Sequence, residues 1–548
     1  MNKQQKPDAF RIKTAPEEVW KEYWQGKEFN MSINGDLGGL YEVVRRNERM
    51  VSGDQWHGVK APDIDKPVLN FLKRAVMYMV AMIVSDNIGI NIKVLGVDEN
   101  SLQGKAISKY LTDNLDEVIE ETSMTTKLRR CVRDAAVDGD ACLYAYWDAA
   151  TEAISLEVVA NTSCIFGNPI VQTVQEQPYI IIEQHRDVRD VQLQAWRAGL
   201  DGWQSIHPDE EKLRRENDTP MGSRTVTVIK KMWRDDDTGH IWFTECTEHM
   251  TLVPPTDTLL SVYPVAWMNW DEVKDNYHGA AIVTNLIPNQ IAVNRLWAGA
   301  LWHLRQQAFP KVIYDKSRLP RGWSNRAGEA IGVPNGNTGD VATAFKAPDM
   351  SADLKEIVER TVSMTRDFMG VNDVVLGNIT PDNTSAIVAV QQSTAAPLEL
   401  QRMAFYQFVE DIVRVIVNLA CANYGLRRVQ LEVTQPDPMT GAEVTVEQEV
   451  EINFSVLPYK SLKLRVDIGE AAYWSELMQV QTMDNLYSKG LIPDAVAYVE
   501  SIPDKYLPNK DKLLETMRQA QQTQQGEATV DAAQDMGGGM MPNAMPYM

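Results

Sequence analysis

Residues 286–308 of this 548-residue chain read LIPNQIAVNRLWAGALWHLRQQA, and residues 351–368 read SADLKEIVERTVSMTRDF. In the first segment apolar side chains recur every three or four residues from Val293 to Ala308, which predicts a helix. In the second, Ser351 offers an N-cap and apolar residues follow one helical face as far as Phe368. We expect Pro288 to lie near the start of the first helix, where its missing N–H costs little.

The segment between these helices, residues 309–350, contains two short strand candidates among several glycines, Lys311–Tyr314 and Val341–Phe345. It is too small for an independent core, so we expect a neighbour, such as further copies of the chain, to stabilise it. Positive charge is concentrated in the stretch from Leu286 to Phe368, although the whole chain has a formal net charge of -21. The cations are Arg295, Arg305, Lys311, Lys316, Arg318, Arg321 and Arg326. This concentration indicates either contact with an anionic or acidic partner or a solvated helix-loop-helix face.

The composition is that of an ordinary soluble protein, with 44% hydrophobic and 24% charged residues. Its acidic balance argues against a general nucleic-acid coat protein. A protein whose surface mostly repels DNA can still guide a duplex past it. The five cysteines form no Cys-x-x-Cys motif or Cys/His cluster, which argues against a zinc site or a disulfide framework and favours a reducing compartment. No signal-peptide pattern opens the chain, and the longest apolar run, Ala75–Val84, is too short to cross a bilayer. We therefore expect a soluble protein, made inside the cell, without a membrane anchor.

The remaining periodicity predicts an α+β fold. A helical region begins at Pro16, and the segment Asn70–Ile83 is apolar on nearly every face, so we expect it to be buried. The other early helices are predicted at Leu37–Val51, Ser101–Thr122, Thr125–Asp138 and Val188–Gly199. Strands are predicted at Ala141–Trp147, Ile154–Val159, Tyr179–Glu183, Arg224–Trp233, His240–Thr247 and Leu259–Tyr263, with a hairpin turn at residues 235–239.

After the second helix of the opening segment, residues 371–383 predict an exposed loop. A long helix follows over residues 384–426, and Pro397 should kink it. The strands predicted at Val429–Val433, Glu443–Phe454 and Leu462–Ile468 should complete the earlier sheet. Helices over residues 469–525 and a disordered tail rich in Gly, Ala, Met and Pro, residues 526–548, end the chain.

No catalytic constellation is recognisable. The sequence contains no phosphate-binding loop, no His-Glu-x-x-His pair, no Gly-x-Ser-x-Gly elbow and no Gly-x-Gly-x-x-Gly motif. Its seven histidines lack metal-ligand spacing. We therefore expect a structural protein with no catalytic residues, no metal and no cofactor.

Several short motifs, in a fixed order, resemble those of bacteriophage portal (head-to-tail connector) proteins. They are Asn47-Glu48-Arg49, Gly53-Asp54-Gln55-Trp56, Asp65-Lys66-Pro67-Val68-Leu69-Asn70, and Gly279 followed by Leu286-Ile287-Pro288-Asn289-Gln290 and Asn294. Each motif is weak alone, but their order and spacing cover most of the chain, from about Leu37 to Gln525. The chain departs from some members in lacking a long helical C-terminal barrel.

The resemblance implies a division of the chain into portal regions. Residues 1–276, together with strands in 427–468, would form the wing, built of helices and a mixed β-sheet. Residues 277–308 and 351–370 would be the two stem helices, and residues 309–350 a small α/β clip between them. Residues 371–383 would be the tunnel loop, 384–426 the kinked channel helix, 469–525 the helical crown, and 526–548 the disordered tail.

The resemblance also implies roles for polar residues. The tunnel-loop side chains that would face DNA are amides and acids, with no cation among them. They are Asn372, Asp373, Asn378, Asp382 and Asn383. Stem cations that would face the channel or a neighbouring subunit are Arg295, Arg305, Lys355, Arg360 and Arg366. Clip cations that would dock the terminase and then the adaptor proteins are Lys311, Lys316, Arg318, Arg321 and Arg326. A simple solvated or inter-subunit salt-bridge role stays open for each.

Family members form rings, typically of twelve subunits, at one vertex of the capsid. The expected partners are therefore further copies of the chain, double-stranded DNA bound without sequence preference, the large terminase, head-tail adaptors, and the major capsid and scaffolding proteins. The expected location is the virion, after assembly in the host cytoplasm. Two alternatives stay open: another virion component, such as a minor head or tail-tube protein, and a nucleic-acid-processing enzyme of packaging, which would need clustered carboxylates for two metals.

Overall fold

Local sequence signals set the ends of several helices. Pro16 occupies the first turn of α1, and the side chain of Asn70 caps α3 by accepting a hydrogen bond from the backbone N–H of Lys73 at 3.0 Å. α2 and α5 end at Gly53 and Gly139, both with positive φ. The helices are α1 (Pro16–Ser32), α2 (Gly39–Ser52), α3 (Phe71–Ile83), α4 (Leu102–Glu121), α5 (Met124–Asp138), α6 (Val188–Arg197), α7 (Ile282–Ala308) and α10 (Glu399–Asn423).

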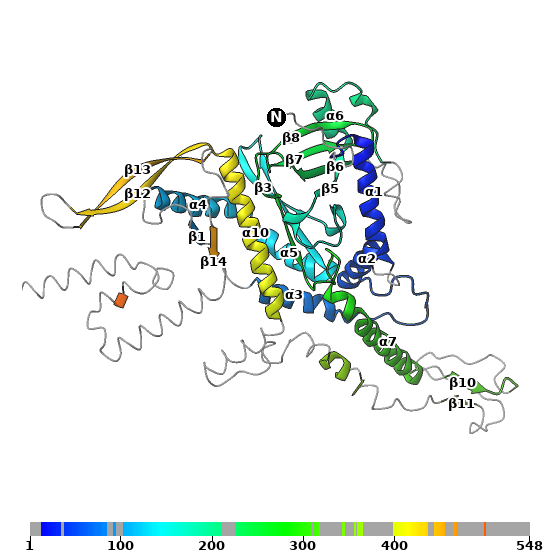
Figure 1. The fold of residues 1–548 in the computed structure, drawn as a ribbon. Helices are drawn as coiled ribbons and strands as arrows, with labels where there is room; N and C mark the ends of the chain where they lie inside the picture. The colour runs from blue at the N-terminus through cyan, green and yellow to red at the C-terminus, as the bar shows by residue number, and fades with distance from the viewer. Residues whose placement is uncertain are drawn as a thin grey trace, which may run out of the picture. The chain divides into compact units, whose positions relative to one another are not determined.

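This computed structural model describes residues 12–33, 38–84, 91–94, 102–209, 225–308, 311–317, 342–345, 356–357, 359–364, 398–436, 443–454, 464–467 and 498–499. The chain divides into two units, Met1–Val466 and Asp467–Met548. The helices and strands named here lie in the first unit, apart from the last residue of the final strand (Figure 1).

The strands form antiparallel sheets. One sheet has the order β4-β5-β6-β7-β8 and another the order β3-β2-β9, while β10 pairs with β11, β12 with β13, and β1 with β14. Every pairing with a defined register is antiparallel. The strands are β1 (Asn91–Val94), β2 (Asp140–Asp148), β3 (Ala153–Val159), β4 (Cys164–Phe166), β5 (Tyr179–Asp187), β6 (Thr225–Arg234), β7 (Ile241–Cys246), β8 (Thr251–Asp257), β9 (Val265–Asn269), β10 (Lys311–Tyr314), β11 (Ala342–Phe345), β12 (Leu426–Pro436), β13 (Glu443–Asn453) and β14 (Leu464–Asp467).

The predicted α+β class is confirmed, but the expectation of a mixed sheet is wrong for these pairings. Short hairpin connections, such as the turn between β6 and β7 at residues 235–239, allow only antiparallel neighbours, because parallel neighbours need a long crossover. The hairpin turn itself is confirmed: the Asp235 carboxylate accepts hydrogen bonds from the backbone N–H and the hydroxyl of Thr238.

α1 covers one face of the five-stranded sheet (Figure 1). Its buried side chains form a core with residues of β4, β5, β6 and β7; the members are Val19, Trp20, Tyr23, Ile165, Ile181, Ile229 and Cys246. Two ion pairs join the same surfaces, one between Lys27 and Glu183 at 3.0 Å and one between Glu22 and the fully buried Lys231. Apolar burial and paired charges together fix α1 on the sheet.

α10 packs against β9 and β2, and its second half is buried almost throughout. Asn418 fixes its position, because the Asn418 side chain accepts a hydrogen bond from the backbone N–H of Ser261 at 3.1 Å and donates one to the Ser261 hydroxyl at 3.2 Å. α10 begins at Glu399. Pro397 and the first part of the predicted long helix lie outside the described residues.

Three sequence predictions are corrected. Leu259–Tyr263 is not a strand; β8 lies before it and β9 after it. β8 contains two adjacent prolines, Pro254 and Pro255, and is an edge strand of its sheet, where missing N–H donors are tolerated. β12 and β13 pair with each other instead of completing the earlier sheet. α3 is buried along one face only, and Met77 on another face is 64% exposed.

All five cysteines are buried and free. They are Cys131, Cys142, Cys164, Cys246 and Cys421. Burial raises the pKa of the Cys131, Cys246 and Cys421 thiols to about 12, because a thiolate in apolar surroundings loses its hydration.

Candidate functional site

α7 has two halves with different surroundings. In residues 282–294, which we call the root, the buried side chains include Val283, Leu286, Ile287 and Val293. In residues 295–308, the outer half, Trp297 is 40% and Leu304 50% exposed. The predicted helix is therefore confirmed, and most of its buried side chains lie in the root, whereas Ala298 is the buried residue of the outer half.

The structure also corrects the start of this helix. The sequence predicts that Pro288 lies near the first turn, whereas α7 begins at Ile282 and Pro288 lies inside it. A proline there removes one backbone hydrogen bond. Burial of Val283 at 0% exposure, and the hydrogen bond that the Thr284 hydroxyl accepts from Asn47 at 2.8 Å, stabilise the additional turn.

A chain of amide side chains holds the root against the turn after α2. Gln290 donates a hydrogen bond to the Asn294 side chain at 3.0 Å, and Asn294 donates one to Gln55 at 2.6 Å. Gln55 in turn donates to the carbonyl of Met50 at the end of α2 at 2.9 Å. The Gln290 side chain also donates to the carbonyl of Leu69 at 2.7 Å, beside the start of α3. Because these groups satisfy one another away from water, the network fixes α2, α3 and α7 in one arrangement.

Motif residues from three separate parts of the sequence, Asn47, Gln55 and Leu69, form hydrogen bonds to the root of α7. Asn47 is fully buried and donates hydrogen bonds both to the Val137 carbonyl at 2.7 Å and to Thr284. Trp56 donates its indole N–H to the carbonyl of Pro67 at 2.8 Å. In the sequence these motifs are related only by their order and spacing, and the fold brings them together around the root of α7.

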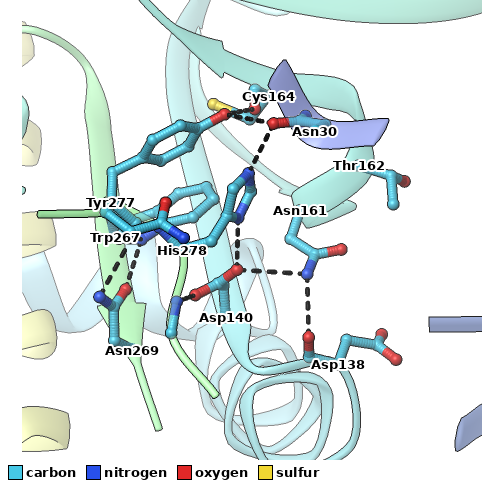
Figure 2. Close-up of polar contacts among 12 residues, drawn as sticks. Asn30, Asp138, Asp140, Asn161, Thr162, Cys164, Trp267, Asn269, Tyr277 and His278 are labelled. Atoms are coloured by element: carbon cyan, nitrogen blue, oxygen red, sulfur yellow. Dashed lines mark hydrogen bonds and ion pairs between the residues drawn. The ribbon is translucent and has the colours of Figure 1, made fainter. Parts of the chain in front are cut away.

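A second buried network lies just before the root (Figure 2). His278 Nδ1 lies 2.6 Å from Asp140 Oδ2, and His278 Nε2 lies 3.1 Å from the side-chain oxygen of Asn30. Asp140 also accepts hydrogen bonds from the backbone N–H of Gly279 at 2.6 Å and from Asn161 at 3.3 Å. Asp140 and His278 are each 1% exposed. This network joins α1, β2 and the segment that leads into α7.

Two glycines allow the backbone to approach closely at this point. Gly139 has a φ of +101°, and a Cβ placed on it would lie 2.8 Å from the carbonyl oxygen of Gly279. A Cβ on Gly279 would lie 2.9 Å from the carbonyl oxygen of Gly139. Neither position has space for a side chain, so the end of α5 and the entry to α7 are held in backbone contact.

A cavity of about 280 Å³ opens between α2, the turn that follows it and α7. Three arginines line it, Arg46 and Arg49 from α2 and Arg295 from α7. Its apolar lining includes Met50, Ile287 and Ile291. We call this cavity the arginine pocket. It combines apolar residues with three arginines, which is the composition of a site for an anion that carries a hydrocarbon stem.

Three carboxylates lie close together near the end of α5. One oxygen from each of Glu48, Asp134 and Asp138 lies within 4.8 Å of the others. Arg133 already pairs with two of them, at 2.7 Å from Glu48 and 3.0 Å from Asp134. Burial, followed by the charges of Glu48 and Asp134, raises the pKa of Asp138 to about 8. The guanidinium therefore neutralises much of the charge that a divalent cation would need.

The predicted cations are only partly described. Arg295 and Arg305 lie exposed on the outer half of α7, Lys316 is exposed just after β10, and Arg360 is exposed on a helical segment. Lys311 begins β10; both β10 and β11 were predicted as strands, and the structure pairs them with each other. The predicted residues outside the described part of the chain are Arg318, Arg321, Arg326, Lys355, Arg366, Asn372, Asp373, Asn378, Asp382 and Asn383.

Sequence reasoning did not select Arg46, Asp140 or His278 as site residues. His278 stands next to Gly279 in the motif before α7, and that position was the available signal. Arg46 lies beside Asn47-Glu48-Arg49 in α2. Arg46 contributes to the site because α2 packs next to α7. These two helices are far apart in the sequence, and no local pattern indicates that they meet.

Within the described part of the chain, no helix combines the length and apolar character needed to cross a bilayer. Comparison with protein-family models and with curated proteins yields no match.

Proposed function

We propose that this chain is a portal-type structural protein: its copies form a ring at a capsid vertex, and double-stranded DNA passes through that ring during packaging and ejection. In this proposal the sheets and their helices form the wing. α7 and the helical residues 356–357 and 359–364 form the stem, and the hairpin β10–β11 belongs to the clip. The crown and tunnel loop are proposed from the sequence resemblance alone.

The observation that carries the proposal is the contrast within α7. The root is fixed by buried apolar contacts and by two polar networks, while Trp297 and Leu304 of the outer half are left partly exposed on a regular helix. Apolar side chains at helical spacing without full cover within the chain are typical of a surface that packs against another molecule. A ring of identical subunits supplies such a neighbour to every copy.

Charge supports the same proposal. A conduit has to let a duplex slide, and each additional lysine or arginine on its wall adds phosphate contacts that slow movement. A chain with 75 acidic and 54 basic residues repels DNA on average, and it still presents exposed cations on α7 and after β10. We propose that these stem and clip cations meet DNA, a neighbouring subunit, the terminase or the adaptor proteins.

Electron microscopy of the purified full-length chain tests the proposal. We expect discrete flanged rings with a central channel in class averages, and a matching multiple of the 61.7 kDa chain mass by mass photometry. A chain that stays monomeric under all assembly conditions, including co-expression with capsid components, would contradict the proposal. Tubes or filaments would instead favour a tail-tube component.

An enzyme of packaging is the other alternative. The carboxylates of Glu48, Asp134 and Asp138 are the group that such a reading would use. Incubation of linear and supercoiled DNA with the protein and Mg²⁺ or Mn²⁺ should leave both substrates intact. Cleavage that is lost in Asp138→Asn would replace the structural proposal with a nuclease.

A further inference from the structure

The arginine pocket contains more positive charge than its surroundings balance. Arg46 Nε is buried and has no hydrogen-bond partner within the described part of the chain. Among the residues that the structure describes, Arg295 forms no ion pair, and the Arg49 side chain donates only to the carbonyl of Arg45, at 3.4 Å. Among the described lining residues the single acid is Asp54, which pairs with His57 at 3.1 Å.

Arginines next to the pocket behave differently. Arg45 is not part of the pocket lining and pairs with Glu42 at 3.2 Å, and Arg133 pairs with Glu48 at 2.7 Å. Their guanidinium groups therefore have carboxylate partners within the chain. The three arginines that line the pocket have no such partner among the residues that the structure describes.

The pocket is rigidly framed. Gln55 and Asn294 belong to its lining and are held by the amide network, and Trp56 is held by its bond to Pro67. Residues of both α2 and the root of α7 contribute to its walls. A site whose walls are fixed before binding loses little conformational entropy when a ligand enters.

We propose that the arginine pocket receives an acidic side chain, aspartate or glutamate, from a neighbouring copy of this chain. The inference rests on the proposed ring. The methylene stem of such a side chain suits the wall formed by Met50, Ile287 and Ile291, and its carboxylate accepts hydrogen bonds from the guanidinium groups.

Two observations favour a carboxylate from a second copy over a DNA phosphate. The phosphates of a duplex lie on a convex rod, which does not enter a cavity of about 280 Å³. The chain also has 21 more acidic than basic residues, from 75 − 54, so every copy offers carboxylates in excess. The pocket adjoins the outer half of α7, whose exposed Trp297 and Leu304 are the surface proposed to meet the next copy.

Charge reversal is the first test. Arg295 is exposed on a helix, so Arg295→Glu should fold normally, with an unchanged circular dichroism spectrum and melting temperature. We expect it to weaken assembly at least tenfold, measured as the protein concentration at which half of the chain is in rings. Arg45→Glu is the matched control, since it makes the same charge change outside the pocket, and it should assemble like the wild type. Arg46→Gln should weaken assembly less than Arg295→Glu.

Zero-length cross-linking is the second test. Arg295→Lys keeps the positive charge and places an amine at the pocket, which a carbodiimide can join to a carboxylate in contact with it. Rings assembled from equal amounts of ¹⁴N- and ¹⁵N-labelled chains distinguish links between copies from links within one. We expect mass spectrometry to find the introduced lysine joined to an Asp or Glu of the other isotope.

The possible outcomes separate this inference from the proposed function. Normal ring formation in Arg295→Glu, together with no cross-link between copies in Arg295→Lys, would overturn the pocket assignment and leave the ring intact. Normal rings whose affinity for duplex DNA falls in Arg295→Glu and Arg46→Gln, but not in Arg45→Glu, would assign the pocket to phosphate and overturn the carboxylate. A wild-type chain that never forms rings would overturn both proposals.

Discussion

The root and the outer half of α7 are consecutive parts of one helix with similar apolar content, but their apolar side chains differ in how far they are buried. In the root, Ile287 is 3% and Val293 0% exposed, and the amide side chains of Gln290 and Asn294 are buried in a complete network. In the outer half, Leu304 on the same apolar stripe is half exposed. The first half therefore fixes the direction of the helix, and the second presents a surface.

This comparison separates stability of the subunit from assembly. A substitution in the root should change the free energy of unfolding, because it removes packing or hydrogen bonds inside the chain. A substitution in the outer half should leave that free energy nearly constant and act only on association. Four variants test this separation, in order of decreasing effect on subunit stability.

The largest effect is expected from Asp140→Ala. The change removes the carboxylate that faces His278 at 2.6 Å and the backbone N–H of Gly279, and it leaves buried donors without an acceptor. We expect a loss of about 3–5 kcal/mol in the free energy of unfolding, measured by equilibrium denaturation in urea. Asp257→Ala is the control, because Asp257 pairs with a histidine, His240, at a partly exposed position. That control should lose less than about 1 kcal/mol. Equal losses would show that the buried network does not anchor α7.

A smaller effect is expected from Ile287→Ala in the root. It removes a buried side chain and leaves a cavity, so the loss should be roughly 2–4 kcal/mol. Leu304→Ala removes a similar side chain from the outer half and should change stability by less than about 0.5 kcal/mol. Thermal unfolding of the two variants in parallel measures the difference. If both variants lose the same stability, the outer half is packed within the subunit and the contrast fails.

Asp138→Asn should stabilise the subunit, and only at higher pH. The folded-state pKa of Asp138 is raised to about 8 from an unfolded value of 3.8, so the native state binds more protons than the unfolded state between these values. Wild-type stability attributable to this group is therefore complete below about pH 4 and is lost as the pH rises toward 8. Asparagine does not titrate, so we expect a gain of roughly 1–3 kcal/mol at pH 8 and almost none at pH 4. A gain of equal size at both pH values would exclude titration as its cause.

The smallest effect on stability is expected from Trp297→Ser combined with Leu304→Ser. Both side chains are substantially exposed, so the melting temperature of the subunit should be nearly constant. Assembly should be lost, because the same side chains are proposed to be buried against the next copy. Sedimentation velocity of the variant and the wild type at matched concentrations measures this. Intact rings would show that the outer half of α7 is not a subunit interface.

The sequence was sufficient where the signal is local. Helical periodicity predicted the start of α1 and both ends of α2, α4, α5 and α6 within a few residues. Lys311–Tyr314 and Val341–Phe345 were predicted as strands among glycines, although their pairing was not predicted. The sequence predicted Asn70 as the first residue of a helix, whereas in the structure Asn70 is the N-cap and α3 begins one residue later, at Phe71. Such errors at helix ends are small because caps and turns act over a few residues.

The sequence was insufficient where structure depends on distant contacts. Pro254 and Pro255 argue locally against a strand, and β8 is tolerated only because it lies at a sheet edge. The apolar character of α3 suggested complete burial, yet Met77 is exposed, since amphipathicity does not reveal which faces have a neighbour. The arginine pocket depends on α2 and α7 meeting, and the pairing of Asp140 with His278 spans 138 residues. Sequence periodicity relates residues a few positions apart and does not indicate contacts over such distances along the chain.

The burial of every native cysteine has a practical value. Thiols that are inaccessible and reluctant to ionise react slowly with maleimides under native conditions. A single cysteine introduced on the outer half of α7 would then be the preferred attachment point for a fluorophore, with no need to mutate the endogenous residues. Energy transfer between donor- and acceptor-labelled chains could follow subunit exchange in real time.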